Sequence, residues 1–217
     1  MRRNFEEAGR GFQRALELKP SYAVAHVRYA YFLFYGMRLN DALDHMRQAQ
    51  KLDPVSSVTN GALGGMLYNA RDFDNSIAYS KRALELEPGS VAAQLNLGEA
   101  YIQKGMFKEA HAAFDRMREV SPRYVAWEKA YTYAREGRRD EAVRMMAEAE
   151  KLSPRRNYFN AALVYGAMGE LDKAFAELDQ VMLNRPMAAA IRFDPQFDVL
   201  RVDPRFNEYL KRKGIAE

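Results

Sequence analysis

The sequence predicts an all-α protein, a solenoid of stacked helical hairpins followed by a C-terminal capping region. Prolines recur at steps of 34 and then 32 residues, at Pro20, Pro54, Pro88, Pro122, Pro154 and Pro186. Between successive prolines, two stretches with apolar residues at three- and four-residue spacing are separated by a glycine or polar break. A repeat of this length is typical of an array in which each unit buries its apolar face against its neighbours.

Small residues recur where the two helices of one unit must approach closely. In the unit at 89–122, Gly98 precedes Tyr101 by three positions in the first helix, and Ala110 precedes Phe114 in the second. Equivalent pairs in the first helices of other units are Ala30 and Leu33, Gly64 and Leu67, Ala130 and Tyr133, and Ala162 and Tyr165. The pattern resembles the tetratricopeptide repeat, a helix–turn–helix unit. This resemblance implies antiparallel hairpins in a right-handed superhelix.

The prolines divide the chain into a half repeat, five complete units and a capping region. We expect these segments at 1–20, then 21–54, 55–88, 89–122, 123–154 and 155–186, and finally 187–217. The half repeat supplies only a second helix, so Phe5, Phe12 and Leu16 lack the partner helix that would cover them. We therefore expect this helix to fray or to self-associate, and we expect the natural start to lie upstream of Met1.

The C-terminal region begins two helices with Asp-Pro pairs, at 194–195 and 203–204, where an aspartate caps the helix and a proline occupies its first turn. The stretch 197–206 and the basic helix that follows to Lys213 resemble the ending of many bacterial tetratricopeptide proteins. These include regulators with a winged-helix DNA-binding domain, adenylate-cyclase-like proteins and serine/threonine kinases. The resemblance implies that this segment is the sensing or scaffolding part of a larger bacterial regulator.

Composition excludes several classes of function. The chain of 217 residues has a formal net charge of +4 and no cysteine, which excludes disulfides, thiolate metal sites and thiol nucleophiles. None of the three histidines, His26, His45 and His111, is spaced with a second metal ligand on one helix turn, and the sequence has no phosphate-binding glycine loop. We expect a protein that is not an enzyme, holds no cofactor or metal, and contacts neither nucleic acid nor membrane. No apolar run approaches the ~18 residues of a membrane span, and we expect a cytoplasmic location.

The resemblance also implies that the first helix of each unit lines an inner, concave wall. The residues expected on that wall are unusually aromatic, and they predict a partner-binding groove formed by Val27, Tyr31, Phe34, Tyr35, Tyr68, Asn69, Glu99, Gln103, Tyr124, Trp127, Tyr131, Arg135 and Phe159. Tyrosine and tryptophan bury a large area at low entropic cost and are enriched at binding hot spots. We expect a protein or peptide partner with apolar anchors, and we expect Trp127 to be partly exposed in the groove.

One known use of the repeat is disfavoured by the same residues. Repeats that bind acidic chaperone tails use lysine, asparagine and arginine on the inner wall, whereas the equivalent positions here include Val27, Tyr31, Gly61 and Gly65. Two other functions stay open. The chain could be the accessory array of a kinase- or cyclase-type enzyme whose catalytic domain lies elsewhere. It could also be a self-assembly module that completes its half repeat against a second copy.

Overall fold

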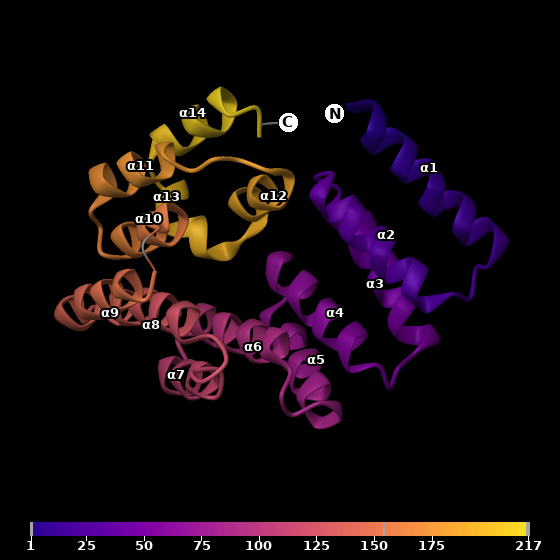
Figure 1. Ribbon diagram of the computed structural model, residues 1–217, viewed down its shortest axis with the longest axis horizontal. Helices are drawn as coiled ribbons and strands as arrows, with labels where there is room; N and C mark the ends of the chain where they lie inside the picture. Colours follow the sequence, from indigo (N-terminus) through magenta and orange to yellow (C-terminus); the bar gives the residue numbers. More distant parts are fainter. Residues whose placement is uncertain (1, 154, 216–217) are drawn as a thin grey trace. The chain divides into compact units, whose positions relative to one another are not determined.

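The computed structural model describes residues 2–153 and 155–215, and the regular secondary structure of these residues is entirely helical (Figure 1). Pro154, one of the recurring prolines, and Met1 lie outside the described residues. The helices are, in chain order, α1 Arg2–Leu18, α2 Ala23–Tyr35, α3 Leu39–Leu52, α4 Ser57–Asn69, α5 Phe73–Leu86, α6 Val91–Gln103, α7 Phe107–Asp115, α8 Pro122–Arg135, α9 Arg139–Lys151, α10 Tyr158–Ala167, α11 Leu171–Asp179, α12 Arg185–Phe193, the 3-10 helix η1 Pro195–Phe197, α13 Asp198–Arg201 and α14 Pro204–Arg212.

The chain forms two compact units, Met1–Asn96 and Leu97–Glu217, and the boundary between them in the sequence falls within α6. Each unit is a stack of antiparallel helical hairpins, the architecture of an α-solenoid. The repeat boundaries themselves stay a prediction. Along the described parts of the chain, no helix combines the length and the apolar character that crossing a membrane requires.

In the first unit, small side chains allow the helices of each hairpin to approach closely. Ala30 of α2 and Ala42 and Ala49 of α3 are fully buried, together with Met46 between the two alanines. The same spacing recurs in the next hairpin, where the hydroxyl oxygen of Ser80 lies 2.6 Å from the place a Cβ on Gly64 would occupy. These contacts confirm the hairpin pattern that the small residues predicted.

Each hairpin turns through a residue in the left-handed backbone region. Glycine occupies this position in three hairpins of the second unit, at Gly105, Gly137 and Gly169, with φ between 70° and 78°. In the first unit, Met37 and Arg71 occupy the equivalent position with φ values of 65° and 63°. Left-handed backbone costs a residue with a side chain roughly 1–2 kcal/mol. The turn is therefore set by the packing of the helices and not by glycine alone.

The N-terminal helix α1 is covered on one side only. Phe5 stacks on Phe32 of α2 with ring centroids 4.0 Å apart, and Phe12 lies 5.8 Å from Tyr29. These rings are half-buried, which differs from the exposed apolar face that the sequence predicted for this helix, because α1 packs directly on α2. Ala8 and Ala15 are exposed, although the corresponding alanines of α3 are fully buried.

The second unit ends in the capping region that the Asp-Pro pairs predicted. The side chain of Asp194 accepts the backbone N–H of Gln196 at the start of η1, and that of Asp203 accepts the backbone N–H of Arg205 at the start of α14. Pro122, expected only to follow a helix, also begins α8. Gly166 of α10 allows α13 to approach closely, since a Cβ there would lie 2.7 Å from the Leu200 side chain.

Replacing Gly98 with alanine is expected to destabilise the second unit by about 2–3 kcal/mol. A Cβ at this position would lie 2.4 Å from the ring of Phe114, which is fully buried and cannot move aside. Intrinsic helix propensity alone predicts the opposite sign, a gain of up to about 1 kcal/mol. Urea unfolding followed by circular dichroism measures the change. Gly89→Ala is the control, because nothing lies within 4 Å of a Cβ there, and equal stabilities for both variants would contradict the close approach.

Candidate functional site

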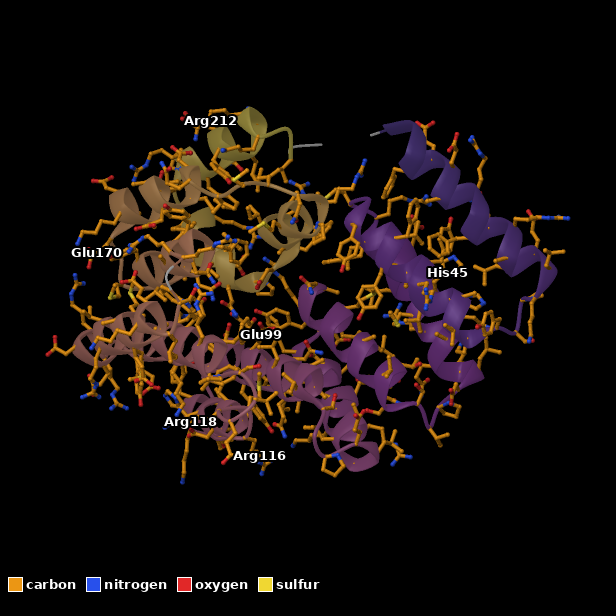
Figure 2. The ribbon with its side chains drawn as sticks, in the orientation of Figure 1. His45, Glu99, Arg116, Arg118, Glu170 and Arg212 are labelled. Carbon is orange, nitrogen blue, oxygen red and sulfur yellow. The ribbon has the colours of Figure 1, made fainter. Side chains whose placement is uncertain are left out.

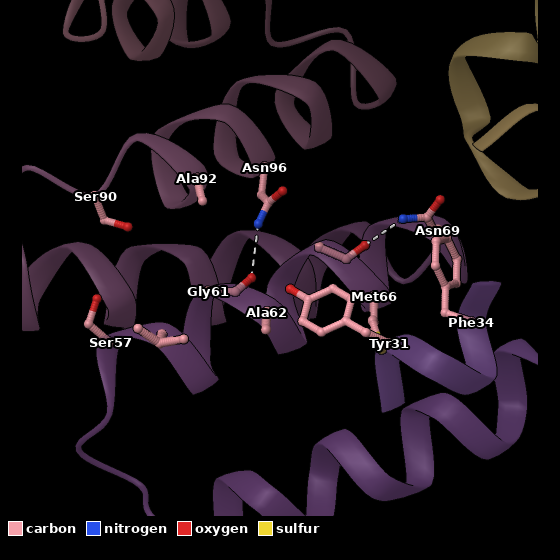
Figure 3. Close-up of a pocket in the computed structure, with 12 residues that line it drawn as sticks. Tyr31, Phe34, Ser57, Gly61, Ala62, Met66, Asn69, Ser90, Ala92 and Asn96 are labelled. Atoms are coloured by element: carbon pink, nitrogen blue, oxygen red, sulfur yellow. Dashed lines mark hydrogen bonds between the residues drawn. The ribbon is translucent and has the colours of Figure 1, made fainter. Parts of the chain in front are cut away.

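The first unit has an open cavity of about 310 Å³ that is lined by the first helices of its hairpins (Figure 3). We call it the first-unit groove. Its lining residues come from α2, α4 and the start of α6, and they are Tyr31, Phe34, Ser57, Val58, Gly61, Ala62, Gly65, Met66, Asn69, Ser90, Ala92 and Asn96. The groove therefore spans the first helices of three successive hairpins, α2, α4 and α6.

Two asparagine side chains order the floor of this groove. The Nδ2 of Asn69 donates to the carbonyl oxygen of Gly65 at 2.8 Å, and the Nδ2 of Asn96 donates to that of Gly61 at 2.9 Å (Figure 3). A Cβ on Gly65 would lie 3.1 Å from the Asn96 amide. Glycine at this position lets the Asn96 side chain lie against α4. The asparagine bond thus ties α6 to α4 and keeps the groove in one shape.

The aromatic side chains of α2 form one wall of the groove. Tyr31 is 38% exposed and lies 6.1 Å from the ring of Tyr35, while Phe34 is half-buried. Burial, and then the neighbouring Tyr35, raises the pKa of Tyr31 above its ordinary value. Tyr31 is therefore neutral at physiological pH. None of the described residues that line the groove carries a charge.

The inner face of the second unit is already occupied. We use this name for the side of α6, α8 and α10 that carries Glu99, Glu128 and Phe159. Residues 194–197, here called the C-terminal segment, lie on it. The hydroxyl of Tyr131 donates to the carbonyl oxygen of Gln196 at 3.2 Å, and the ring of Phe159 meets that of Phe197 edge-on at 5.0 Å.

Three carboxyl groups converge around the side chain and backbone of Gln196. Its Nε2 lies 3.4 Å from Oε1 of Glu99 and 3.5 Å from Oε2 of Glu128, and its backbone N–H donates to Asp194 at 2.8 Å. Glu99, labelled in Figure 2, extends from α6. Burial, and then the nearby Asp194, raise the pKa of Glu128 to about 8. Burial, and then the neighbouring Glu128 carboxyl, also raise the pKa of Glu99 well above its ordinary value. Among the described residues, no group of His, Cys, Asp and Glu side chains could hold a metal ion.

The structure corrects the predicted groove at its largest aromatic residues. Trp127, Tyr131 and Tyr68 are each 2% exposed, so the expectation of a partly exposed tryptophan is wrong. Tyr131 is covered by the C-terminal segment through its bond to Gln196. Trp127 lines an open cavity of about 300 Å³ together with Leu152 and Asn157, near the point where α9 leads into α10. The sequence pattern placed these residues on the correct helices but could not show what covers them.

The other predicted groove residues divide between the two units. Tyr31, Phe34 and Asn69 meet in the first-unit groove. Val27 and Tyr35 are half-buried on α2 outside the groove lining. In the second unit, Arg135 donates to the Tyr131 hydroxyl at 3.0 Å, and Glu99, Gln103 and Phe159 are half-buried. The ring of Tyr124 is 38% exposed.

Among the site residues that sequence reasoning missed are Asn96 and Gln196. Asn96 follows Ala92 by four positions on α6, so helical spacing alone would have placed it on the same wall. Gln196 follows an Asp-Pro pair that predicted a helix start and nothing more. No local signal shows that the C-terminal segment returns to α8, 65 residues earlier in the chain.

Comparisons with known proteins identify the repeats. Sequence models of the tetratricopeptide repeat match residues 67–132 and 124–148. The tetratricopeptide repeat-containing protein trd-1 of Caenorhabditis elegans is 25% identical over 142 residues, which are 64% of this chain and 18% of that protein. The chain thus spans less than a fifth of that relative.

Solved structures share the fold over most of the chain. That of PilW, a type IV pilus biogenesis factor, has a TM-score of 0.69 at 20% identity, covering 92% of this chain and 91% of that chain. That of YrrB, described as a TPR protein with an unusual peptide-binding site, has a TM-score of 0.57 at 24% identity, covering 70% and 79%. At these identities the similarity concerns the fold alone.

Proposed function

Because the chain is a tetratricopeptide repeat protein, we propose that it is a noncatalytic module that binds a protein or peptide through the first-unit groove. Arrays of this kind present long surfaces to other proteins. The observation that carries the proposal is the open cavity of about 310 Å³ between α2, α4 and α6. The ending at 197–213 supports a further part of the proposal, that the module senses or scaffolds within a larger bacterial regulator.

The lining of the groove defines the chemistry of the ligand. Tyr31 and Phe34 offer apolar area beside an uncharged floor. A cavity near the lower end of the ~300–1,000 Å³ range of ligand pockets accommodates a few side chains of an extended segment. The ligand is therefore a peptide segment with apolar anchors. An acidic tail fits poorly, because a carboxylate would lose water without a cation to pair with.

The tyrosine at the rim of the groove provides the test. Peptides selected from a random peptide library on the immobilised full chain are expected to share apolar anchor positions. Tyr31→Ala is expected to weaken their binding about tenfold or more, the magnitude of an aromatic hot spot. Isothermal titration calorimetry measures the affinities, and circular dichroism checks the fold.

Tyr158→Ala is the matched control. Tyr158 has the same exposure as Tyr31, 38%, but lies on α10 in the second unit. It is expected to leave the affinity unchanged. If no peptide is enriched, or if Tyr31→Ala and Tyr158→Ala bind the selected peptides equally, the groove is not the binding site.

A further inference from the structure

The C-terminal segment contacts the inner face of the second unit as a bound peptide would. The Tyr131 hydroxyl donates a hydrogen bond to the main chain of the segment, at the carbonyl oxygen of Gln196. The same hydroxyl accepts a hydrogen bond from Arg135 at 3.0 Å. Its Gln196 amide points between two glutamate carboxyls, and its Phe197 ring meets Phe159 edge-on. A different group of the inner face therefore contacts each part of the segment: its main chain, its glutamine side chain and its aromatic side chain.

The shape of the segment comes from its own neighbourhood in the chain. Arg201 donates to the carbonyl oxygens of Ile191, Arg192 and Asp194 at 2.8–3.0 Å. The Asp194 side chain accepts the Gln196 N–H, which closes the turn. These hydrogen bonds, which close the turn, are all made within residues 191–201. A ligand that is already in its bound conformation when free loses less conformational entropy on binding than a flexible one.

We propose that the inner face of the second unit is a second peptide-binding site, that its ligand is a turn presenting a side-chain amide next to an aromatic ring, and that the chain's own C-terminal segment closes this site. A partner with an Asp-Pro-Gln-Phe-like turn binds by displacing the resident segment. This inference is independent of the first-unit groove, because its residues all lie in the other unit. Tests of the two sites can therefore fail separately.

The carboxyl pair explains why the site selects an amide. A glutamine Nε2 offers two N–H donors, one for each glutamate. A carboxylate at the same place would add negative charge beside Glu99, Glu128 and Asp194. A lysine or arginine could pair with the carboxyls but would bring a charge into a site where Glu128 is only 4% exposed. The neutral amide donates to both carboxyl acceptors without that cost.

The charge state of the site gives the contact a pH dependence. The Glu128 carboxyl faces Tyr124 on its own helix, Glu99 on α6, and Asp194 and Gln196 on the C-terminal segment. Because the pKa of Glu128 is about 8, it retains a proton at neutral pH. Above that pH, the negative charge of Glu128 is repelled by that of Asp194. Closure by the C-terminal segment should therefore weaken as the pH rises through about 8.

A labelled peptide tests whether the site can exchange its occupant. The peptide has the sequence of residues 191–201 and is added to the full chain, with binding followed by fluorescence anisotropy at pH 7. Gln196→Ala in the protein should raise the affinity for this peptide about tenfold, because it weakens the competing resident segment. The same substitution within the peptide should abolish the gain.

Two results would overturn the inference. One is a folded Gln196→Ala protein, by circular dichroism, that binds the labelled peptide no better than the unsubstituted protein. The other is equal binding of the normal peptide and the peptide with alanine at the glutamine position.

Hydrogen exchange of the unsubstituted chain supplies a second measurement that does not require a variant. After correction for intrinsic exchange rates, protection of residues 193–201 should fall about tenfold more than that of α11 between pH 6.5 and pH 9. An equal loss of protection in both regions would mean that the C-terminal segment is a fixed part of the fold. This conclusion would hold even if the Gln196→Ala variant failed to fold.

Discussion

Trp127→Ala is expected to lower the free energy of unfolding by about 3–5 kcal/mol, the cost of truncating a buried tryptophan. Trp127 is 2% exposed and lines a cavity with Leu152 and Asn157, so truncating its buried side chain removes packing and enlarges that cavity. Urea unfolding followed by circular dichroism measures the change, since the variant has no tryptophan to report by fluorescence.

Tyr158→Ala serves as the control for this substitution as well. It also removes an aromatic ring from the second unit, but the ring is 38% exposed, and the expected loss is below about 1 kcal/mol. Trp127→Phe should fall between the two, because it keeps part of the buried area. A loss below about 1 kcal/mol for Trp127→Ala would show that the side chain is not part of the core.

Glu128→Gln is expected to stabilise the protein at alkaline pH by about 2–4 kcal/mol. Glu128 has a folded-state pKa of about 8 because of burial and the nearby Asp194. Between the ordinary glutamate value and pH 8, the folded chain therefore holds a proton that the unfolded chain has lost. Stability is greatest below that range and falls as the pH rises through it, by about 1.4 kcal/mol per pH unit for one proton.

Glutamine keeps the shape and hydrogen-bonding groups of the side chain but cannot ionise. The stability of Glu128→Gln should therefore depend less on pH between 5 and 9 than that of the unsubstituted protein. Chemical unfolding at several pH values measures both slopes. Glu119→Gln is the control, because Glu119 is an exposed carboxylate of the same unit. Parallel stability curves for all three proteins would contradict the buried, protonated state of Glu128.

The hairpins were predictable from the sequence because their geometry depends on residues that are close together in the chain. Close approach of two helices needs a small side chain at a fixed spacing, and Ala30, Ala42, Ala110 and Ala130 are fully buried where the pattern placed them. The asparagine bonds of the first-unit groove depend on the same periodicity. Helix pairing and much of that groove therefore follow from residues that are close in sequence.

The occupied inner face of the second unit was not predictable in this way. The assignment of Ala130 as the small residue correctly set the register of α8, and Tyr131 lies on the inner face as that register requires. Its exposure was still predicted wrongly, because the covering group is Gln196, which lies 65 residues further along the chain. Periodicity reports which side of a helix a residue occupies, and only the tertiary structure reports what lies opposite.

Because of the left-handed turns at Met37 and Arg71, we expect the hairpins of the first unit to be less stable than those of the second. The corresponding turns of the second unit use glycine, which adopts this backbone at little steric cost. Two hairpins of the first unit thus carry a penalty of roughly 1–2 kcal/mol each. A less stable region has the most to gain from a ligand that binds only its folded form. A peptide segment bound in the first-unit groove would therefore stabilise these two hairpins, and the first unit would become more rigid as the groove is occupied.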